Sequence, residues 1–206
     1  MPTRPKFPKP QAIVFALILL PSFAYAAIDR NIEFLFYAVV TTILAGVIWW
    51  MHRRVGFTNG LLWLLTVWAA LHMAGGLIRI PAAWGEGDYP VIYNLWLVPP
   101  GTIGGFYLRY DHLVHAFGFG VTAWAVWQGL RSIMPSLCPA LGPLFIAWIG
   151  AQGCGALNEI VEFAAVVAVE ETNVGDFTNA MLDLCANATG ALVAVVAIYF
   201  SGRSRP

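Results

Sequence analysis

Six stretches of the chain are long and apolar enough, or nearly so, to cross a lipid bilayer as helices, and this constrains the fold most. A spanning helix needs about 20 mostly apolar residues, and a continuous helix satisfies all its backbone hydrogen bonds internally. Of the 206 residues, 59% are hydrophobic and 11% are charged, whereas soluble domains carry about 25% charged residues. The sequence therefore predicts an all-α polytopic membrane protein, a six-helix transmembrane bundle. The predicted helices cover residues 11–27, 34–51, 61–79, 112–134, 140–169 and 177–200.

We expect residues 1–206 to form a single integral membrane domain, with its polar residues concentrated in a core at 61–200. The first segment, 11–27, has two interpretations. It can be a retained helix or a secretory signal, because basic residues precede it and Ala24-Tyr25-Ala26 resembles a cleavage site. Both interpretations place the residues that follow it outside.

Two further segments allow alternatives. Residues 80–110 form the one long connection, which is rich in proline, glycine and aromatic residues. We expect it to dip into the membrane or to cap the bundle. The fifth helix is long enough to tilt, or to break at its glycines, Gly150, Gly153 and Gly155.

Basic residues are distributed unequally between the two sides of the predicted bundle. With the N-terminus inside, eight of the 11 Lys and Arg residues fall on the inner side, and the outer side receives Arg30, Arg79 and Arg109. The inner set is Arg4, Lys6, Lys9, Arg53, Arg54, Arg131, Arg203 and Arg205. Trp49 and Trp50 end the second helix at the inner interface, as in an aromatic belt. The positive-inside rule therefore predicts that both termini are inside.

Eight polar residues lie within or beside the apolar segments. An ionised side chain at the bilayer centre costs at least about 3 kcal/mol, so such residues usually have a function. With a rise of about 1.5 Å per residue, the predicted helix directions place them in the outer half of the membrane, and their spacing places them on one face of each helix. The sequence therefore predicts one outward-facing polar cavity, built by the third to sixth helices. The eight residues are His72, Asp111, His115, Glu159, Glu162, Asp176, Asp183 and Asn187.

The residue types in this cavity suit a divalent metal. Two imidazoles with several carboxylates favour zinc, manganese or iron, and a cation offsets the repulsion between buried acids. Asp111 is expected to orient His115, and Asp111 and Glu159 are the candidate catalytic residues, since a carboxylate off the metal can act as general base for a metal-activated water. The candidate ligands are His72, His115, Glu159, Glu162 and Asp183.

Other polar residues have candidate roles outside the ligand set. Arg79 and Arg109 are expected above the site, where a guanidinium can pair with an acid or bind an anionic head group. With Asp176 and Asn187 they are the candidate substrate-binding residues. We expect His112 to face the rim of the bundle.

Several motifs resemble the YjdF-like family of bacterial inner-membrane proteins. They are His72-Met73-Ala74-Gly75-Gly76, Tyr110-Asp111-His112-Leu113-Val114-His115, then Asn158, Glu159 and Glu162, and finally Gly175, Asp176 and Asp183. The resemblance spans about residues 60–195 and keeps the order of the motifs. The last helix, with Asp183, Asn187 and Gly190, is also similar to VanZ-like proteins linked to glycopeptide resistance. The resemblance implies a multi-pass protein of the bacterial inner (cytoplasmic) membrane, and it implies no particular reaction.

These observations favour a membrane-embedded, metal-dependent activity on a lipid or envelope substrate. One alternative is a proton- or cation-coupled transporter that uses the same carboxylates as a relay. Another is an accessory subunit that docks on a partner in a membrane complex. A third is that the polar residues only hold the helices together by hydrogen bonds. The formal net charge of zero provides no basic face for nucleic acid. The three cysteines lack CxxC spacing, so we expect free thiols: Cys138, Cys154 and Cys185.

Overall fold

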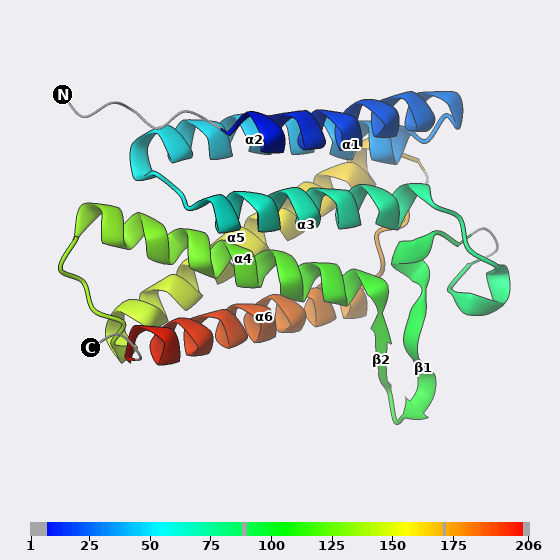
Figure 1. The fold of residues 1–206 in the computed structure, drawn as a ribbon. Coiled ribbons are helices and arrows are strands. Elements are labelled where there is room, and N and C mark those ends of the chain that lie inside the picture. Colours follow the sequence, from blue (N-terminus) through cyan, green and yellow to red (C-terminus); the bar gives the residue numbers. More distant parts are fainter. Residues whose placement is uncertain (1–7, 88–89, 171, 204–206) are drawn as a thin grey trace.

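The protein is described by a computed structural model that covers residues 8–87, 90–170 and 172–203. Within these ranges six long helices run alternately in opposite directions, with α1 and α2 at the top of Figure 1, α6 at the bottom, and α3 and α4 between them. The all-α class and the six helices are thus confirmed. The helices are α1 (Lys9–Ile28), α2 (Ile32–Val55), α3 (Asn59–Leu77), α4 (Tyr110–Ile133), α5 (Leu141–Ala168) and α6 (Phe177–Arg203).

Five of these helices, all except α4, are long and apolar enough to cross a membrane by length and composition. The 24-residue α4 matches them in length, but its first turns carry Asp111, His112 and His115. It packs against α3, α5 and α6. Because its neighbours cover much of its surface, α4 can carry these polar groups inside an otherwise apolar bundle.

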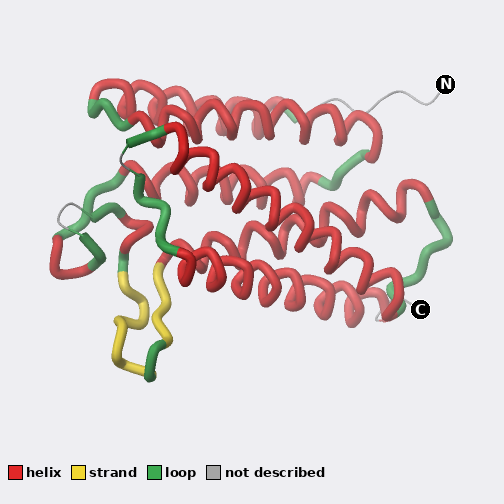
Figure 2. The backbone as a smooth tube through the Cα atoms, turned by 180° about the vertical axis from the view of Figure 1, so that it is seen from behind, coloured by secondary structure: helices red, strands yellow, loops and turns green. Residues whose placement is uncertain are grey.

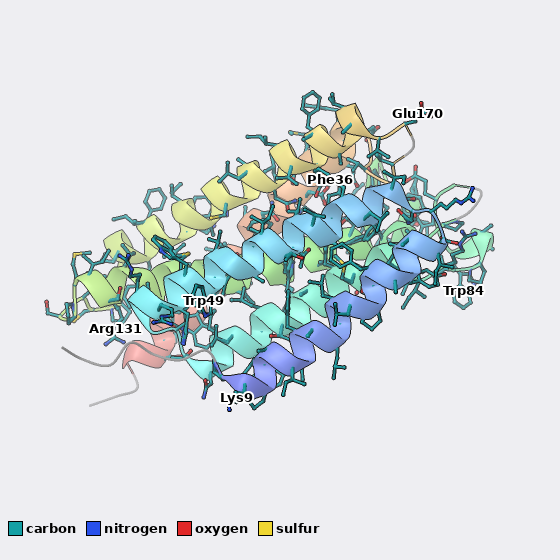
Figure 3. The ribbon with its side chains drawn as sticks, turned by 90° about the horizontal axis from the view of Figure 1, so that it is seen from above. Lys9, Phe36, Trp49, Trp84, Arg131 and Glu170 are labelled. Carbon is teal, nitrogen blue, oxygen red and sulfur yellow. The ribbon has the colours of Figure 1, made fainter. Side chains whose placement is uncertain are left out.

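The two ends of the bundle differ in charge. We call the end that carries residues 29–31, 78–87, 90–109, 169–170 and 172–176 the hairpin end, and the opposite end the terminal end. Figure 3 shows Lys9, Trp49 and Arg131 towards the terminal end, and Trp84 and Glu170 at the hairpin end.

Aromatic rings accompany the basic residues of the terminal end. The guanidinium of Arg53 lies 5.4 Å from the ring centre of Trp49, and that of Arg54 lies 5.2 Å from the ring of Trp50. These pairs fit the interfacial belt predicted there. Arg4, Lys6 and Arg205, which also entered the orientation argument, lie outside the described residues.

The long connection contains structure that the sequence analysis did not predict. Two short 3-10 helices, η1 (Ala82–Trp84) and η2 (Ile92–Asn94), precede the antiparallel strands β1 (Trp96–Ile103) and β2 (Phe106–Arg109). The hairpin extends away from the helices (Figures 1 and 2), whereas η2 packs against α3 and α4. The connection therefore caps the bundle through η2, one of the two predicted arrangements.

The fifth helix does not break. It is continuous from Leu141 to Ala168 through its glycines, and it crosses the bundle obliquely behind the other helices in Figure 1. Of the two predicted alternatives, the structure has the tilt. The oblique course matters because α5 carries two of the candidate ligands.

Helices α4 and α6 approach each other very closely. A Cβ atom at Gly190 would collide with the backbone of Ala116, and one at Gly120 would lie 3.0 Å from the carbonyl oxygen of Gly190. Glycine at these positions therefore lets the two backbones touch. This contact brings the polar face of α4 next to that of α6.

Candidate functional site

Four carboxylates surround the imidazole of His115, which is 8% exposed. Its Nε2 atom lies 3.5 Å from Glu162 Oε1 and 3.6 Å from Asp111 Oδ1. The same nitrogen is 3.9 Å from Asp183 Oδ1, and Nδ1 is 3.8 Å from Glu159 Oε1. Three helices, α4, α5 and α6, thus bring their predicted polar residues together at one histidine.

Asn187 fixes the orientation of this imidazole. Its Oδ1 atom lies 3.1 Å from His115 Nδ1, and because a carboxamide oxygen only accepts, Nδ1 carries the proton. The opposite nitrogen, Nε2, faces Glu162, Asp111 and Asp183, and it can bind a metal once it has lost its own proton. We predicted that Asp111 would orient His115; in the structure Asn187 makes that hydrogen bond, and Asp111 lies at the opposite nitrogen.

Four residues could hold one metal ion: His115, Glu159, Glu162 and Asp183. Each offers a ligand atom, and these atoms all lie within 4.8 Å of one another. Metal–ligand bonds of about 2.1 Å place opposite ligands about 4.2 Å apart, so small side-chain movements would complete the coordination. The site also fits a cation electrostatically, because Glu159 Oε1 and Asp183 Oδ1 are buried without a hydrogen-bond partner. Such unpaired buried oxygens are costly.

His72, also a predicted ligand, lies outside this group of four. Its Nδ1 forms a hydrogen bond with the hydroxyl of Tyr93, and its ring stacks on Trp68 with centres 5.3 Å apart. The rings of Phe34 and Tyr37 lie 6.0 Å and 5.6 Å away. The donor set at His115 is therefore one imidazole and three carboxylates, with His72 in an aromatic surrounding beside it.

A cavity of about 40 Å³ connects the two histidines. His72, Asp111, His115 and Glu162 line it, whereas Asp183, which is fully buried, does not. A water molecule needs about 10–15 Å³ of such volume. The cavity therefore has room for a few waters or a small ion, and it is too small for a lipid head group.

A second network holds Asp183 in place. The buried guanidinium of Arg109 donates to Glu86 Oε2 at 2.7 Å and to Asn179 Oδ1, and Asn179 Nδ2 donates to Asp183 Oδ2 at 2.7 Å. Arg109, expected at the outer surface, is thus only 3% exposed. It lines the cavity, but its hydrogen bonds go to protein groups.

The prediction for His112 is wrong. This residue is 1% exposed, because its Nδ1 accepts a hydrogen bond of 2.8 Å from the backbone N–H of Arg109 and so caps the first turn of α4. Its Nε2 then carries the proton, and it lies 3.7 Å from Asp183 Oδ1. His112 is therefore a neighbour of the cluster and stands away from the rim.

Two of the predicted substrate-binding residues make other contacts. Arg79 is exposed, and its Nη2 lies 3.0 Å from Asp29 Oδ2. Asp176 precedes α6 and accepts a hydrogen bond of 3.0 Å from the backbone N–H of Asn179, which caps that helix. Neither residue lines the cavity.

Comparison with known proteins agrees with this architecture. The chain belongs to the family described as "Predicted membrane protein (DUF2238)". The family profile matches residues 11–204, a range that includes the six helices except for the first two residues of α1, and the cluster at His115. No curated protein and no solved structure matches the chain. Membership of the DUF2238 family therefore supports the membrane assignment and specifies no reaction.

The residues that line the cavity but were not predicted include Glu33, Tyr93 and Asn173. Glu33, in the first turn of α2, is 4% exposed; its position four residues before Tyr37, another lining residue, on one helix face was the available signal. Nothing in the sequence placed Tyr93 beside His72. Burial raises the pKa of Tyr93 well above its usual value, so its hydroxyl stays protonated as a hydrogen-bonding group.

Proposed function

We propose that this DUF2238 protein binds one divalent transition metal ion at His115, Glu159, Glu162 and Asp183, and uses it on a lipid or envelope substrate. The observation that carries the proposal is the pair of unpaired, buried carboxylate oxygens, on Glu159 and Asp183, that face His115. Burying an ionised carboxylate away from water costs several kcal/mol. A divalent cation offsets that cost for two carboxylates at once.

The donor set narrows the choice of metal. One imidazole and three carboxylate oxygens favour manganese or iron, with zinc as the third candidate, because oxygen-rich sites suit the harder cations. Asn187 supports the site by holding His115 in the tautomer that leaves Nε2 free to bind. His72 is not one of these four ligands, although it was predicted as a ligand from the sequence.

Asp111 is the proposed general base. It lines the cavity, lies 3.6 Å from His115 Nε2, and stands outside the group of four, so its carboxylate can take a proton from a cavity water. A divalent ion at this site would supply the acidity that makes such a water a nucleophile near neutral pH. Glu159, the other candidate base, does not line the cavity, so we assign it to the metal.

The cellular setting belongs to the same proposal. We place both termini in the cytoplasm and the hairpin end outside, because the described basic residues Lys9, Arg53, Arg54 and Arg131 gather at the terminal end. The YjdF-like and VanZ-like resemblances support the bacterial inner membrane as its location. The small cavity implies that a large substrate presents only its reacting bond to the site.

Cation- or proton-coupled transport is the second candidate. The observation that favours it is the row of acids along a water-sized cavity, Glu33, Asp111 and Glu162, of a kind that proton relays use. The relay requires no tightly bound transition metal.

Metal content tests the two candidates. Purified without chelator, the wild type should contain a stoichiometric transition metal. Glu162→Gln and His115→Ala should each lower the content, and the two losses should not add because both report one site. His72→Phe, which keeps the aromatic packing, should retain the metal. A wild type free of transition metal, with pH-dependent transport that Glu162→Gln abolishes, would establish the relay.

A further inference from the structure

A larger groove opens at the hairpin end of the bundle. Its volume is about 710 Å³, and its wall includes the α1–α2 turn, the end of α3 and residues 168–170 and 172–173. Glu170, which lies at this end in Figure 3, belongs to the wall. Among the residues that the structure describes, the acids that line the groove are Asp29, Glu33, Glu86 and Glu170, and the bases are Arg30 and Arg79. Polar groups therefore line this groove at the hairpin end of the apolar bundle, and we call the groove the vestibule.

Two residues, Glu33 and Asn173, line both this groove and the cavity at His115, and the other lining residues belong to one space or the other. The two residues are bonded to each other. Glu33 Oε2 accepts hydrogen bonds of 2.9 Å from the backbone N–H of Asn173 and of 2.9 Å from its Nδ2. This contact is therefore the boundary between the vestibule and the site.

The charge along this route favours a cation. Glu33 is an almost fully buried carboxylate, and it interacts electrostatically with Glu162 and Asp111 on the cavity side. In the groove, Arg79 is paired with Asp29 and Arg30 is a further base, and Arg109 of the cavity is paired with Glu86. From the boundary inward, the acids Glu33, Asp111 and Glu162 line the cavity at His115, an arrangement that attracts cations and repels anions.

We propose that Glu33 and Asn173 form the entrance by which a divalent cation passes from the vestibule to the His115 cluster, an inference that rests on the proposed metal binding. The carboxylate of Glu33 receives the cation, and the hydrogen bonds from Asn173 hold the entrance closed. Asn173 lies outside the helices, so breaking these bonds opens the route without unpacking the bundle.

Uptake of Co²⁺ by metal-free protein in nanodiscs, followed by visible absorbance, tests the entrance. Asn173→Ala should accelerate uptake by about tenfold, because one hydrogen bond to a charged group is worth that factor. Glu33→Gln keeps an acceptor oxygen but removes the charge, so uptake should slow by about tenfold and lose much of its salt dependence. The matched control is Glu170→Gln, which removes an equal charge from the exposed wall of the same groove. All three variants should bind as much cobalt at equilibrium as the wild type.

The outcomes separate the entrance from the metal site. If Glu170→Gln slows uptake as much as Glu33→Gln, or if Asn173→Ala does not accelerate it, the entrance is refuted while metal binding stands. If Glu33→Gln fails to fold by thermal unfolding, the rate of Asn173→Ala alone decides. A wild type that binds no cobalt at equilibrium refutes the metal site, and the entrance with it.

Discussion

Replacing Asn187 by leucine should weaken metal binding while leaving the fold intact. The substitution removes the oxygen that accepts from His115 Nδ1 at 3.1 Å, which leaves a buried donor unpaired at a cost of about 1–3 kcal/mol. It also removes Asn187 Nδ2, a buried nitrogen that itself has no hydrogen-bond partner, and this relieves a penalty of the same order. The two effects on unfolding free energy therefore nearly cancel.

The effect on metal affinity does not cancel. Without Asn187 the imidazole can change tautomer and place its proton on Nε2, the nitrogen that faces the carboxylates. Loss of such a supporting hydrogen bond typically lowers metal affinity about 10- to 100-fold, which corresponds to about 1.4–2.7 kcal/mol. Asn187→Asp restores an acceptor for Nδ1 and should keep the affinity.

The assay is competition with a chelator of known affinity, combined with thermal unfolding in the same detergent. Gln152→Leu is the matched control, since Gln152 Nε2 is also buried without a hydrogen-bond partner and the residue is not one of the four candidate ligands. Wild-type affinity in Asn187→Leu, or an equal loss in Gln152→Leu, would refute the assignment of the tautomer.

Two further predictions concern packing and orientation. A Cβ atom at Gly155 would lie 2.8 Å from Asn187 Nδ2, so Gly155→Ala should lower the free energy of unfolding by about 1–3 kcal/mol and weaken metal binding. Gly153 has nothing within 4 Å of such an atom, so Gly153→Ala should be neutral or slightly stabilising in the same unfolding assay. For orientation, an impermeant thiol reagent applied outside intact cells should label Glu86→Cys and spare the native Cys138; the opposite pattern would reverse the proposed topology.

The convergence on His115 was predictable because two regular quantities determine it. Helix rise gives the depth of a residue, and helical periodicity gives its face. Both apply to α4, α5 and α6, so Asp111, Glu162 and Asp183 were placed together correctly. Helix geometry also led to the expectation that His72 lies near His115, and both line one cavity, but it could not show that a hydrogen bond to Tyr93 would take up the Nδ1 of His72.

Three of the residues that were missed or misplaced share a different property. Tyr93, Arg109 and His112 lie in or directly after the long connection, where neither periodicity nor hydropathy specifies direction. Arg109 is buried because Glu86 and Asn179 accept its hydrogen bonds, and a sequence does not reveal such partners. A charge near a predicted membrane surface is therefore a poor indicator of exposure unless its hydrogen-bond partners are known.

The helices that carry the candidate ligands show between which helices the repulsion of the buried acids acts. Helices α4 and α6 touch through Gly190 and Ala116, so His115 and Asp183 are held by a contact that leaves little room for adjustment. Glu159 and Glu162 come from α5, which crosses the bundle obliquely (Figure 1). Repulsion among the carboxylates consequently acts between α5 and the α4–α6 pair. A cation bound among them would join α5 to that pair, and it would stabilise the folded state by an amount that rises with metal concentration.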